Sequence, residues 1–421
     1  MGNDTAIELA PNSATTVSPI RGAWVVLGCA TGMLVGFSAS YFSTLSIFLK
    51  PISAAFGWNR TETSAISSLA QLGLALGAPI TGRLIERWGA RRVVFSSTVM
   101  FSVGLAALSM CSGNAVLFAI LSLVLGLVAV GTTPPGYLSV LPALFDRRLG
   151  LAMGIAMVGL GCGNALMPLL AQRWIGGGGW QSAYRHVALA VLAGGVVAWL
   201  LLSSAGSGVR TRVVSRQASM EPIAQGNGWS IVRTWRFLVL IIVFFVVSSA
   251  GLGAIVHMIP LLTDHGLSPS QASSVAALIG IGVMIGRAGT GALIDVIHVR
   301  HVAAVEFILG SAGLLLIATS PATHSALIAL GAFAFAFVIG AEGDFIPFFV
   351  RRYFGIEHFS FLYGVLFFFF ALGGVAGPVS FGWAFDYFHS YNIAYGAAGV
   401  ACAGCAALIW TLGDYAYPVV R

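Results

Sequence analysis

Charged residues are scarce in this sequence. Asp, Glu, Lys and Arg make up 8% of the 421 residues, whereas soluble domains carry about 25%. Hydrophobic residues make up 58%, and the mean hydropathy is +0.92. This composition excludes a soluble globular domain and favours an integral membrane protein. The net charge of +7 does not indicate a nucleic-acid partner, because the basic residues fall in short loops between apolar stretches.

Motifs for enzyme chemistry are also missing. The five cysteines lie in apolar stretches and no His/Cys cluster accompanies them, so we expect no metal site and no redox chemistry. The nucleotide-binding pattern GxxxxGK[ST] is absent, so ATP-driven transport has no support. No catalytic triad is recognisable. We therefore expect neither an enzyme nor a cofactor.

Apolar stretches of about 20 residues, the length that crosses a bilayer as a helix, recur along the chain. They predict an all-α integral membrane protein with twelve transmembrane helices in two pseudo-symmetric six-helix bundles. The expected spans are 22–47, 62–85, 92–112, 115–141, 150–173, 183–204, 236–262, 270–295, 302–320, 324–349, 360–386 and 391–412. The predicted domains are a disordered cytoplasmic tail (1–21), an N-terminal bundle (22–204), a cytoplasmic linker (205–235), a C-terminal bundle (236–412) and a second cytoplasmic tail (413–421).

The distribution of basic residues predicts the orientation. With both termini in the cytoplasm, most arginines lie on the cytoplasmic side, and only Lys50, Arg60, Arg173 and Arg185 lie outside. Basic residues of short loops concentrate on the cytoplasmic side of membrane proteins. We therefore expect both termini to be cytoplasmic.

The two halves repeat each other. GRLIE at 82–86 corresponds to GALID at 291–295, an offset of 209 residues. The same offset aligns Gly57 with Gly266, Ser64 with Ser273, Gly77 with Gly286 and Thr81 with Thr290. Duplicated halves are typical of transporters whose substrate site lies at the membrane midplane between the repeats.

The segment GRLIERWGARR (82–92) resembles the loop signature of the major facilitator superfamily, and GALIDVIHVRH (291–301) is a degenerate copy in the second half. Within that superfamily, residues 36–60, 131–138, 257–268, 340–344 and 363–378 resemble the monocarboxylate transporter and oxalate–formate antiporter group, especially its bacterial members. The resemblance implies a monomer in the plasma membrane, the inner membrane of a bacterium.

Arg287 is the leading candidate for substrate binding, because it is the one charge well inside the span 270–295. An arginine there costs at least about 2.5 kcal/mol and needs a cavity or a partner. Its planar fork can bind a carboxylate with two hydrogen bonds, and the resemblance places it where the group has its substrate-binding arginine. The alternative is a structural ion pair with a neighbouring helix.

The sequence departs from the relatives around this arginine. Val283 stands where animal monocarboxylate transporters have an aspartate, and Ser43 where they have a lysine. The antiporter's lysine falls in a run of phenylalanines here, 367–370. Further substrate ligands are expected among polar groups of the first and fourth spans, which alternatively connect helices to one another; these are Tyr41, Ser43, Thr133 and Tyr137.

Glu342 and Asp344 are candidates for proton coupling. They flank Gly343 in the tenth span, and because they lie two residues apart on a helix, we expect only one to face Arg287. Depth in the membrane slightly favours Glu342. The alternative is a gate pair with the arginines at 351–352.

GAEGD (340–344) aligns with GTTPP (131–135), which predicts a break in the helix of both halves. His257, near the outer end of the seventh span, is a third proton candidate.

A cytoplasmic gate is expected at the repeated loop motif. Glu86 and Asp295 end their helices with a carboxylate that can face a helix N-terminus across the interface between the halves. Arg87 and Arg91 are assigned to the same gate. The alternative is that these charges only orient the chain in the membrane.

The predicted function is secondary-active transport of small monocarboxylates by alternating access, coupled to proton symport. Co-transport of a carboxylate and a proton moves no net charge, so it does not oppose the membrane potential. Two alternatives stay open: an organic-anion exchanger of the oxalate–formate type, and an efflux pump for lipophilic compounds. The expected partners are a small carboxylate, protons and the lipid bilayer.

Overall fold

The computed structural model describes residues 19–58, 60–145, 148–203, 228–264, 266–267, 269–320 and 324–417, and all regular structure in them is helical. The N-terminal half contains α1 (Pro19–Leu34), η1 (Ser38–Phe42), α2 (Leu45–Phe56), α3 (Arg60–Trp88), α4 (Ala90–Leu108), α5 (Ala115–Ala129), η2 (Val130–Thr132), α6 (Pro134–Tyr137), η3 (Leu138–Ala143) and α7 (Leu149–Ser203). The C-terminal half contains α9 (Gly228–Val232), α10 (Trp235–Asp264), α11 (Pro269–Leu293), α12 (Val299–Thr319), α13 (Ser325–Phe354), α14 (Phe359–Phe388) and α15 (Asn392–Trp410).

Nine stretches of the described chain are long and apolar enough to cross a membrane, and the 55-residue α7 counts once among them. Its backbone leaves helical geometry at Gly178 and Gly179, and Gly179 has φ of +76°, a region that favours glycine. Residues 149–203 therefore hold the fifth and sixth spans. Together with α3 and α11, these stretches account for the twelve predicted spans.

The first span is less regular than predicted. Instead of one helix over 22–47, α1 is followed by the wide turn η1 and then by α2, which continues to Phe56. The hydroxyls of Ser40, Ser43 and Thr44 donate to main-chain carbonyls within this segment. Such bonds compete with regular helix geometry and bend the chain.

The predicted helix break is correct in the fourth span and wrong in the tenth. Residues 130–143 form the short segments η2, α6 and η3, because Pro134 and Pro135 supply no amide hydrogen for a continuous helix. The aligned residues 340–344 continue within α13, which runs unbroken from Ser325 to Phe354. No proline occurs between Gly340 and Asp344, so every backbone amide there can extend the helix.

The repeat predicted from sequence is visible in matching helix contacts. A Cβ atom placed on Gly77 of α3 would collide with the carbonyl oxygen of Leu127 in α5. A Cβ atom on Gly286 of α11 would collide in the same way with the carbonyl of Phe337 in α13. Glycine lets these backbones approach closely, as small residues do in membrane bundles. Equivalent residues thus perform the same packing in both halves.

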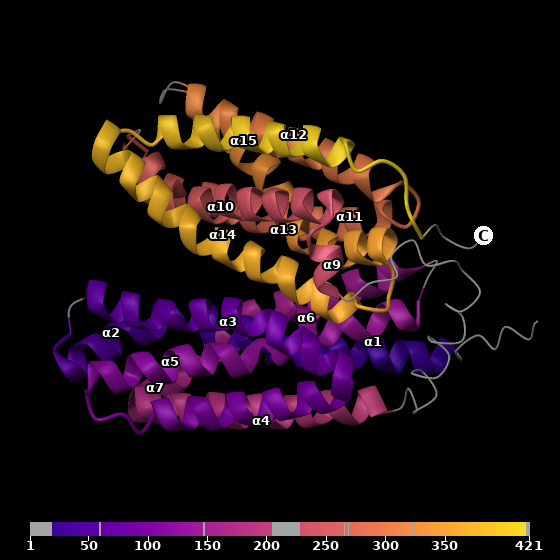
Figure 1. Cartoon of the computed structure of the whole chain (residues 1–421). Helices are drawn as coiled ribbons and strands as arrows, with labels where there is room; N and C mark the ends of the chain where they lie inside the picture. The colour runs from indigo at the N-terminus through magenta and orange to yellow at the C-terminus, as the bar shows by residue number, and fades with distance from the viewer. Residues whose placement is uncertain are drawn as a thin grey trace, which may run out of the picture.

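The two bundles form separate bodies that converge at one end (Figure 1). The indigo-to-magenta helices of the N-terminal half lie below the orange-to-yellow helices of the C-terminal half, and the ribbons come together at the right, near the C-terminus. There, α3 contacts α14, and α7 contacts α11. A Cβ atom on Gly82 would collide with the carbonyl of Ser360, which shows how closely the halves approach.

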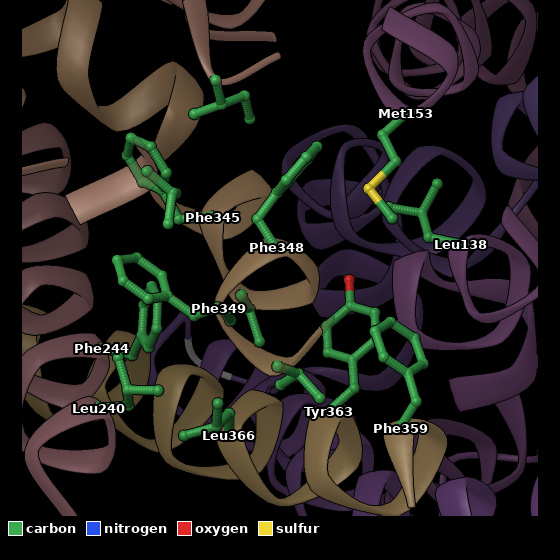
Figure 2. Packing of buried hydrophobic residues seen from close by; sticks show 14 of the residues in the cluster. Leu138, Met153, Leu240, Phe244, Phe345, Phe348, Phe349, Phe359, Tyr363 and Leu366 are labelled. Carbon is green, nitrogen blue, oxygen red and sulfur yellow. The ribbon is translucent and has the colours of Figure 1, made fainter. Parts of the chain in front are cut away.

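Apolar side chains from both halves fill this junction (Figure 2). One buried cluster includes Leu138 and Met153 from the N-terminal half with Phe348, Phe359 and Tyr363 from the C-terminal half. Close packing of these side chains stabilises the contact between the halves, because each buried side chain gains many dispersion contacts. The cluster therefore joins the two bundles at the end where their ribbons converge.

The chain termini differ partly from the predicted domains. Helix α1 begins at Pro19, inside the predicted tail. Residues 1–18 and 204–227 lie outside the described residues, and the second stretch includes most of the predicted linker, 205–235. The C-terminal segment 413–417 contacts the bundle: Tyr353 donates a hydrogen bond of 2.8 Å to the carbonyl of Gly413, and Arg300 pairs with Asp414 at 3.0 Å. This tail is docked along its described part.

Candidate functional site

Arg287 lies on α11 and reaches α13. Its Nε atom donates a 2.8 Å hydrogen bond to the carbonyl of Gly340 and lies 3.2 Å from Oδ2 of Asp344. The Arg287 side chain is 24% exposed and the Asp344 side chain is 12% exposed. Within the described residues, no hydrogen bond or ion pair involves the two terminal nitrogens of Arg287. The outer edge of the guanidinium is thus available for a further acceptor.

Asp344, and not Glu342, pairs with Arg287. The two acids lie two residues apart on α13 and point in different directions, as expected for a helix. The carboxylate of Glu342 lies against Gly251 of α10, where an added Cβ would stand 3.2 Å from Oε2. Depth in the membrane slightly favours Glu342, but the rotation of α13 about its axis decides which acid meets Arg287. The alternative gate pair of either acid with Arg351 or Arg352 stays a prediction.

A third buried acid, Glu306, was not selected from the sequence. It lies on α12, is 4% exposed, and accepts a hydrogen bond from Thr290 of α11, one turn beyond Arg287. Its other carboxylate oxygen has no hydrogen-bond partner among the described residues. A single acid inside an apolar span is itself the signal that would have identified it.

The four polar residues assigned to substrate in the N-terminal half use their hydroxyls within that half. Ser43 donates to Ala39 at 2.6 Å, Thr133 donates to Val130 at 2.6 Å, and Tyr41 donates to Ser122 at 3.5 Å. Tyr137 is 1% exposed and is hydrogen-bonded to Thr98. In this conformation the structure does not bring them together with Arg287, and their role in binding stays a prediction.

His257 connects helices of the C-terminal half. Its Nε2 lies 3.0 Å from the carbonyl of Pro378, and its Nδ1 lies 3.2 Å from the hydroxyl of Tyr391. Since a carbonyl only accepts, Nε2 carries the hydrogen of its contact with Pro378. Both ring nitrogens are occupied by structural contacts, so this geometry favours a bridging role over proton relay.

The two motif acids cross the junction between the halves. Asp295, after α11, accepts hydrogen bonds of 2.7 Å from the amide of Gly150 and 2.9 Å from that of Leu151, at the start of α7. Glu86, near the end of α3, accepts a 2.9 Å hydrogen bond from the amide of Phe361 in the first turn of α14. A carboxylate satisfies the free amides of a helix N-terminus and complements its dipole.

Burial and hydrogen bonding shift the pKa values of Asp295 and Glu86 in opposite directions. Burial raises the pKa of Asp295, while the amides of Leu151 and Gly150 lower it. Burial likewise raises the pKa of Glu86, and the amide of Phe361 lowers it. The stabilisation from each contact is therefore the hydrogen-bond gain less a desolvation cost.

The arginines assigned to the gate do not cross the junction. Arg87 is exposed, and the guanidinium of Arg91 stacks on Trp199 in the same half, 4.5 Å from the ring centre. Arg83 takes that place, because its guanidinium lies 4.2 Å from the ring centre of Phe361 in α14. Arg83 precedes Glu86 by about one helical turn, so both side chains reach α14 from neighbouring positions on α3.

Two further features lie apart from this site. We expected no CxxC pair, but Cys402 and Cys405 of α15 have that spacing, and both are buried free thiols. No group of three metal-ligating side chains occurs in the part of the chain that the structure describes. A groove of about 380 Å³ between α10, α14 and α15 has apolar and small side chains and does not include Arg287.

The two six-helix halves, joined at one end by an apolar cluster and by Glu86 and Asp295, define a multi-pass membrane transporter of the secondary-active class. The family model described as Major Facilitator Superfamily matches residues 29–349. The chain belongs to this superfamily, as its loop signature predicted.

Relatives among characterised proteins are distant. The chain is 24% identical to the MFS transporter asaE of Aspergillus flavus over 383 residues, which cover 88% of this chain and 81% of that protein. It is 28% identical to rat monocarboxylate transporter 1 over 170 residues, 40% of this chain and 34% of that protein. It is 20% identical to human monocarboxylate transporter 2 over 294 residues, 66% and 61% of the two chains.

Solved structures agree on the fold. The proton:xylose symporter XylE superposes with a TM-score of 0.72 at 13% identity, covering 94% of this chain and 97% of that one. The Escherichia coli fucose:proton symporter FucP gives a TM-score of 0.69 at 14% identity, covering 94% and 99%. At this identity the likeness establishes the architecture alone.

Proposed function

We propose that this protein is a proton-coupled carrier of small monocarboxylates that acts by alternating access. The observation that carries the proposal is the geometry of Arg287. Its Nε is held by Gly340 and Asp344, while its terminal nitrogens are unengaged within the described residues and the side chain is 24% exposed. A planar fork in that arrangement matches a carboxylate with two parallel hydrogen bonds.

Asp344 is the proposed coupling acid. At 3.2 Å from Arg287, it neutralises the guanidinium when no substrate is present. A substrate carboxylate adds a second negative charge to this site, and protonation of Asp344 removes the excess. Arg287 with a bound carboxylate and a neutral Asp344 has no net charge, which is the least costly state to carry across an apolar barrier.

The proposed orientation assigns a conformation to the structure. If both termini are cytoplasmic, the junction formed by Glu86, Asp295 and the apolar cluster is the cytoplasmic gate, and it is closed. The site around Arg287 would then receive substrate from the opposite side. We propose the monomer as the working unit and the plasma membrane as its location, the inner membrane for a bacterial protein.

Proteoliposome uptake tests the function. Purified protein is reconstituted and supplied with a panel of labelled acids, including lactate, pyruvate, a short-chain fatty acid and an aromatic acid. We expect accumulation of at least one acid that rises with an inward proton gradient and collapses with a protonophore. Uptake that needs preloaded internal anion and ignores the protonophore would instead establish the exchanger, and a panel without any uptake would refute carboxylate transport.

A further inference from the structure

The interior of the C-terminal bundle contains more acids than bases. Glu306, Glu342 and Asp344 lie in the spans α12 and α13, and all three residues are buried. Arg287 pairs with one of them, Asp344. Each further ionised carboxylate would be an uncompensated charge within the membrane, which is strongly disfavoured.

Glu306 is the best-defined of the acids left without a cation. One of its carboxylate oxygens accepts the hydroxyl hydrogen of Thr290, and the other has no partner among the described groups. An ionised Glu306 would have one hydrogen bond for its two oxygens and no cation to balance its charge. The neutral acid has no charge to compensate, so a buried oxygen without a partner costs it far less.

The other groups around Glu306 do not supply a positive charge. From α13, the negative charge of Asp344 acts on it, and Glu342 points to α10. The buried Arg352, near the end of α13, lies over the ring of Tyr415, 5.9 Å from its centre. From α11, Thr290 provides the hydroxyl, and Arg287 is engaged with Asp344. From α15, the titratable side chains of the described part are Tyr395, Cys402 and Cys405, none of which is a cation.

We propose that Glu306 is a second proton-binding site, which holds a proton while Asp344 is paired with Arg287. Protonation of Asp344 removes the neighbouring negative charge, so the occupancy of Glu306 depends on the state of the Arg287 pair. The hydrogen bond from Thr290 connects Glu306 to the helix that carries Arg287, because Thr290 and Arg287 lie one turn apart on α11. The role of Glu306 in transport rests on the proposed function, whereas the presence of a proton on Glu306 does not.

Infrared spectroscopy tests the proton directly. Wild type and Glu306→Gln are compared in lipid nanodiscs at neutral pH, in water and in deuterated water. We expect the difference spectrum, wild type minus variant, to contain the carbonyl band of a protonated carboxylic acid, shifted by deuteration. If the variant instead loses the band of an ionised carboxylate, Glu306 is ionised in wild type and the proposal is wrong. Asp386→Asn, at an exposed acid, is the matched control and should lose no protonated band.

Two further variants keep the test decisive if Glu306→Gln does not fold. Thr290→Val retains Glu306 and removes its hydrogen bond, so the protonated band should remain and change frequency. Asp344→Asn removes the neighbouring charge, so the band should change in position or intensity. A band that is unaffected in both variants would overturn the assignment to Glu306.

The transport measurement separates the second site from a structural role. Gln keeps the size and the acceptor of Glu306, so a purely structural residue would tolerate Glu306→Gln with an unchanged pH profile. We expect the initial uptake rate to depend less steeply on proton concentration in this variant. An unchanged profile would overturn the role in coupling. If wild type carries no acid of the panel, the proposed function fails, and the infrared result still decides whether Glu306 holds a proton.

Discussion

Removal of the Asp295 carboxylate should open the junction between the halves by a measurable amount. Asp295→Ala deletes the acceptor of the Gly150 and Leu151 amides, at 2.7 and 2.9 Å. Loss of a helix N-cap costs about 0.5–2 kcal/mol, typically about 1. Because burial raises the pKa of this carboxyl, desolvation offsets part of the gain, and we expect about 1 kcal/mol. That value corresponds to about a fivefold shift from the closed to the open junction.

Distances between spin labels report this equilibrium. Trp88 at the end of α3 and Val296 after α11 are exposed, by 57% and 87%, and belong to different halves. Cysteines placed there can be labelled in a Cys162→Ser background, since Cys162 is the exposed member of the five native thiols. Pulsed electron resonance should show a larger population of long distances in Asp295→Ala.

Asp386→Ala is the control, because it removes an exposed acid far along α14 from this junction. The control should reproduce the wild-type distance distribution. If Asp295→Ala also reproduces it, the carboxylate does not hold the halves together, and its role as a gate is wrong. A similar shift in both variants would indicate a general effect of lost charge.

Three further predictions follow from named contacts. Asp344→Asn imitates the protonated acid, so exchange of labelled for unlabelled substrate should persist while proton-driven accumulation fails; retained accumulation would remove Asp344 from coupling. Glu342→Gln should keep accumulation, because Glu342 faces Gly251 and not Arg287; selective loss of accumulation there would restore it as the coupling acid. Gly77→Val forces a Cβ into the carbonyl of Leu127, so overpacking of about 1–3 kcal/mol should lower the thermal midpoint of the purified protein, and an unchanged midpoint would show that the helices can separate without cost.

Local sequence patterns were sufficient for most of the architecture. The spans follow from apolar length, and the repeat follows from glycines such as Gly77 and Gly286, whose close contacts need no side chain. The positions of Glu86 and Asp295 at helix ends also followed from the motif. These features depend on properties that a short stretch of sequence contains, namely hydropathy, the smallness of glycine and the charge of a helix terminus.

The arrangement of the site depends on helix rotation, which the sequence does not fix. Glu342 and Asp344 lie at similar depth, and only the orientation of α13 decides that Asp344 meets Arg287. On α3, packing against α14 places Arg83 over the ring of Phe361, whereas Arg87 is exposed. Glu306 required knowledge that α12 lies beside Thr290. Contacts between helices distant in sequence are set by tertiary packing, so residue patterns within one helix could not reveal them.

The central claim is that Arg287 binds the carboxylate through the terminal nitrogens of its planar fork. Arg287→Lys tests it most directly, because the positive charge remains and the fork is lost. Uptake of the acid identified for wild type is measured in proteoliposomes that contain equal amounts of folded protein, with Asp386→Asn as the control. We predict severely reduced uptake by Arg287→Lys and normal membrane insertion. Uptake at the wild-type rate would mean that the arginine serves only as a structural partner of Asp344.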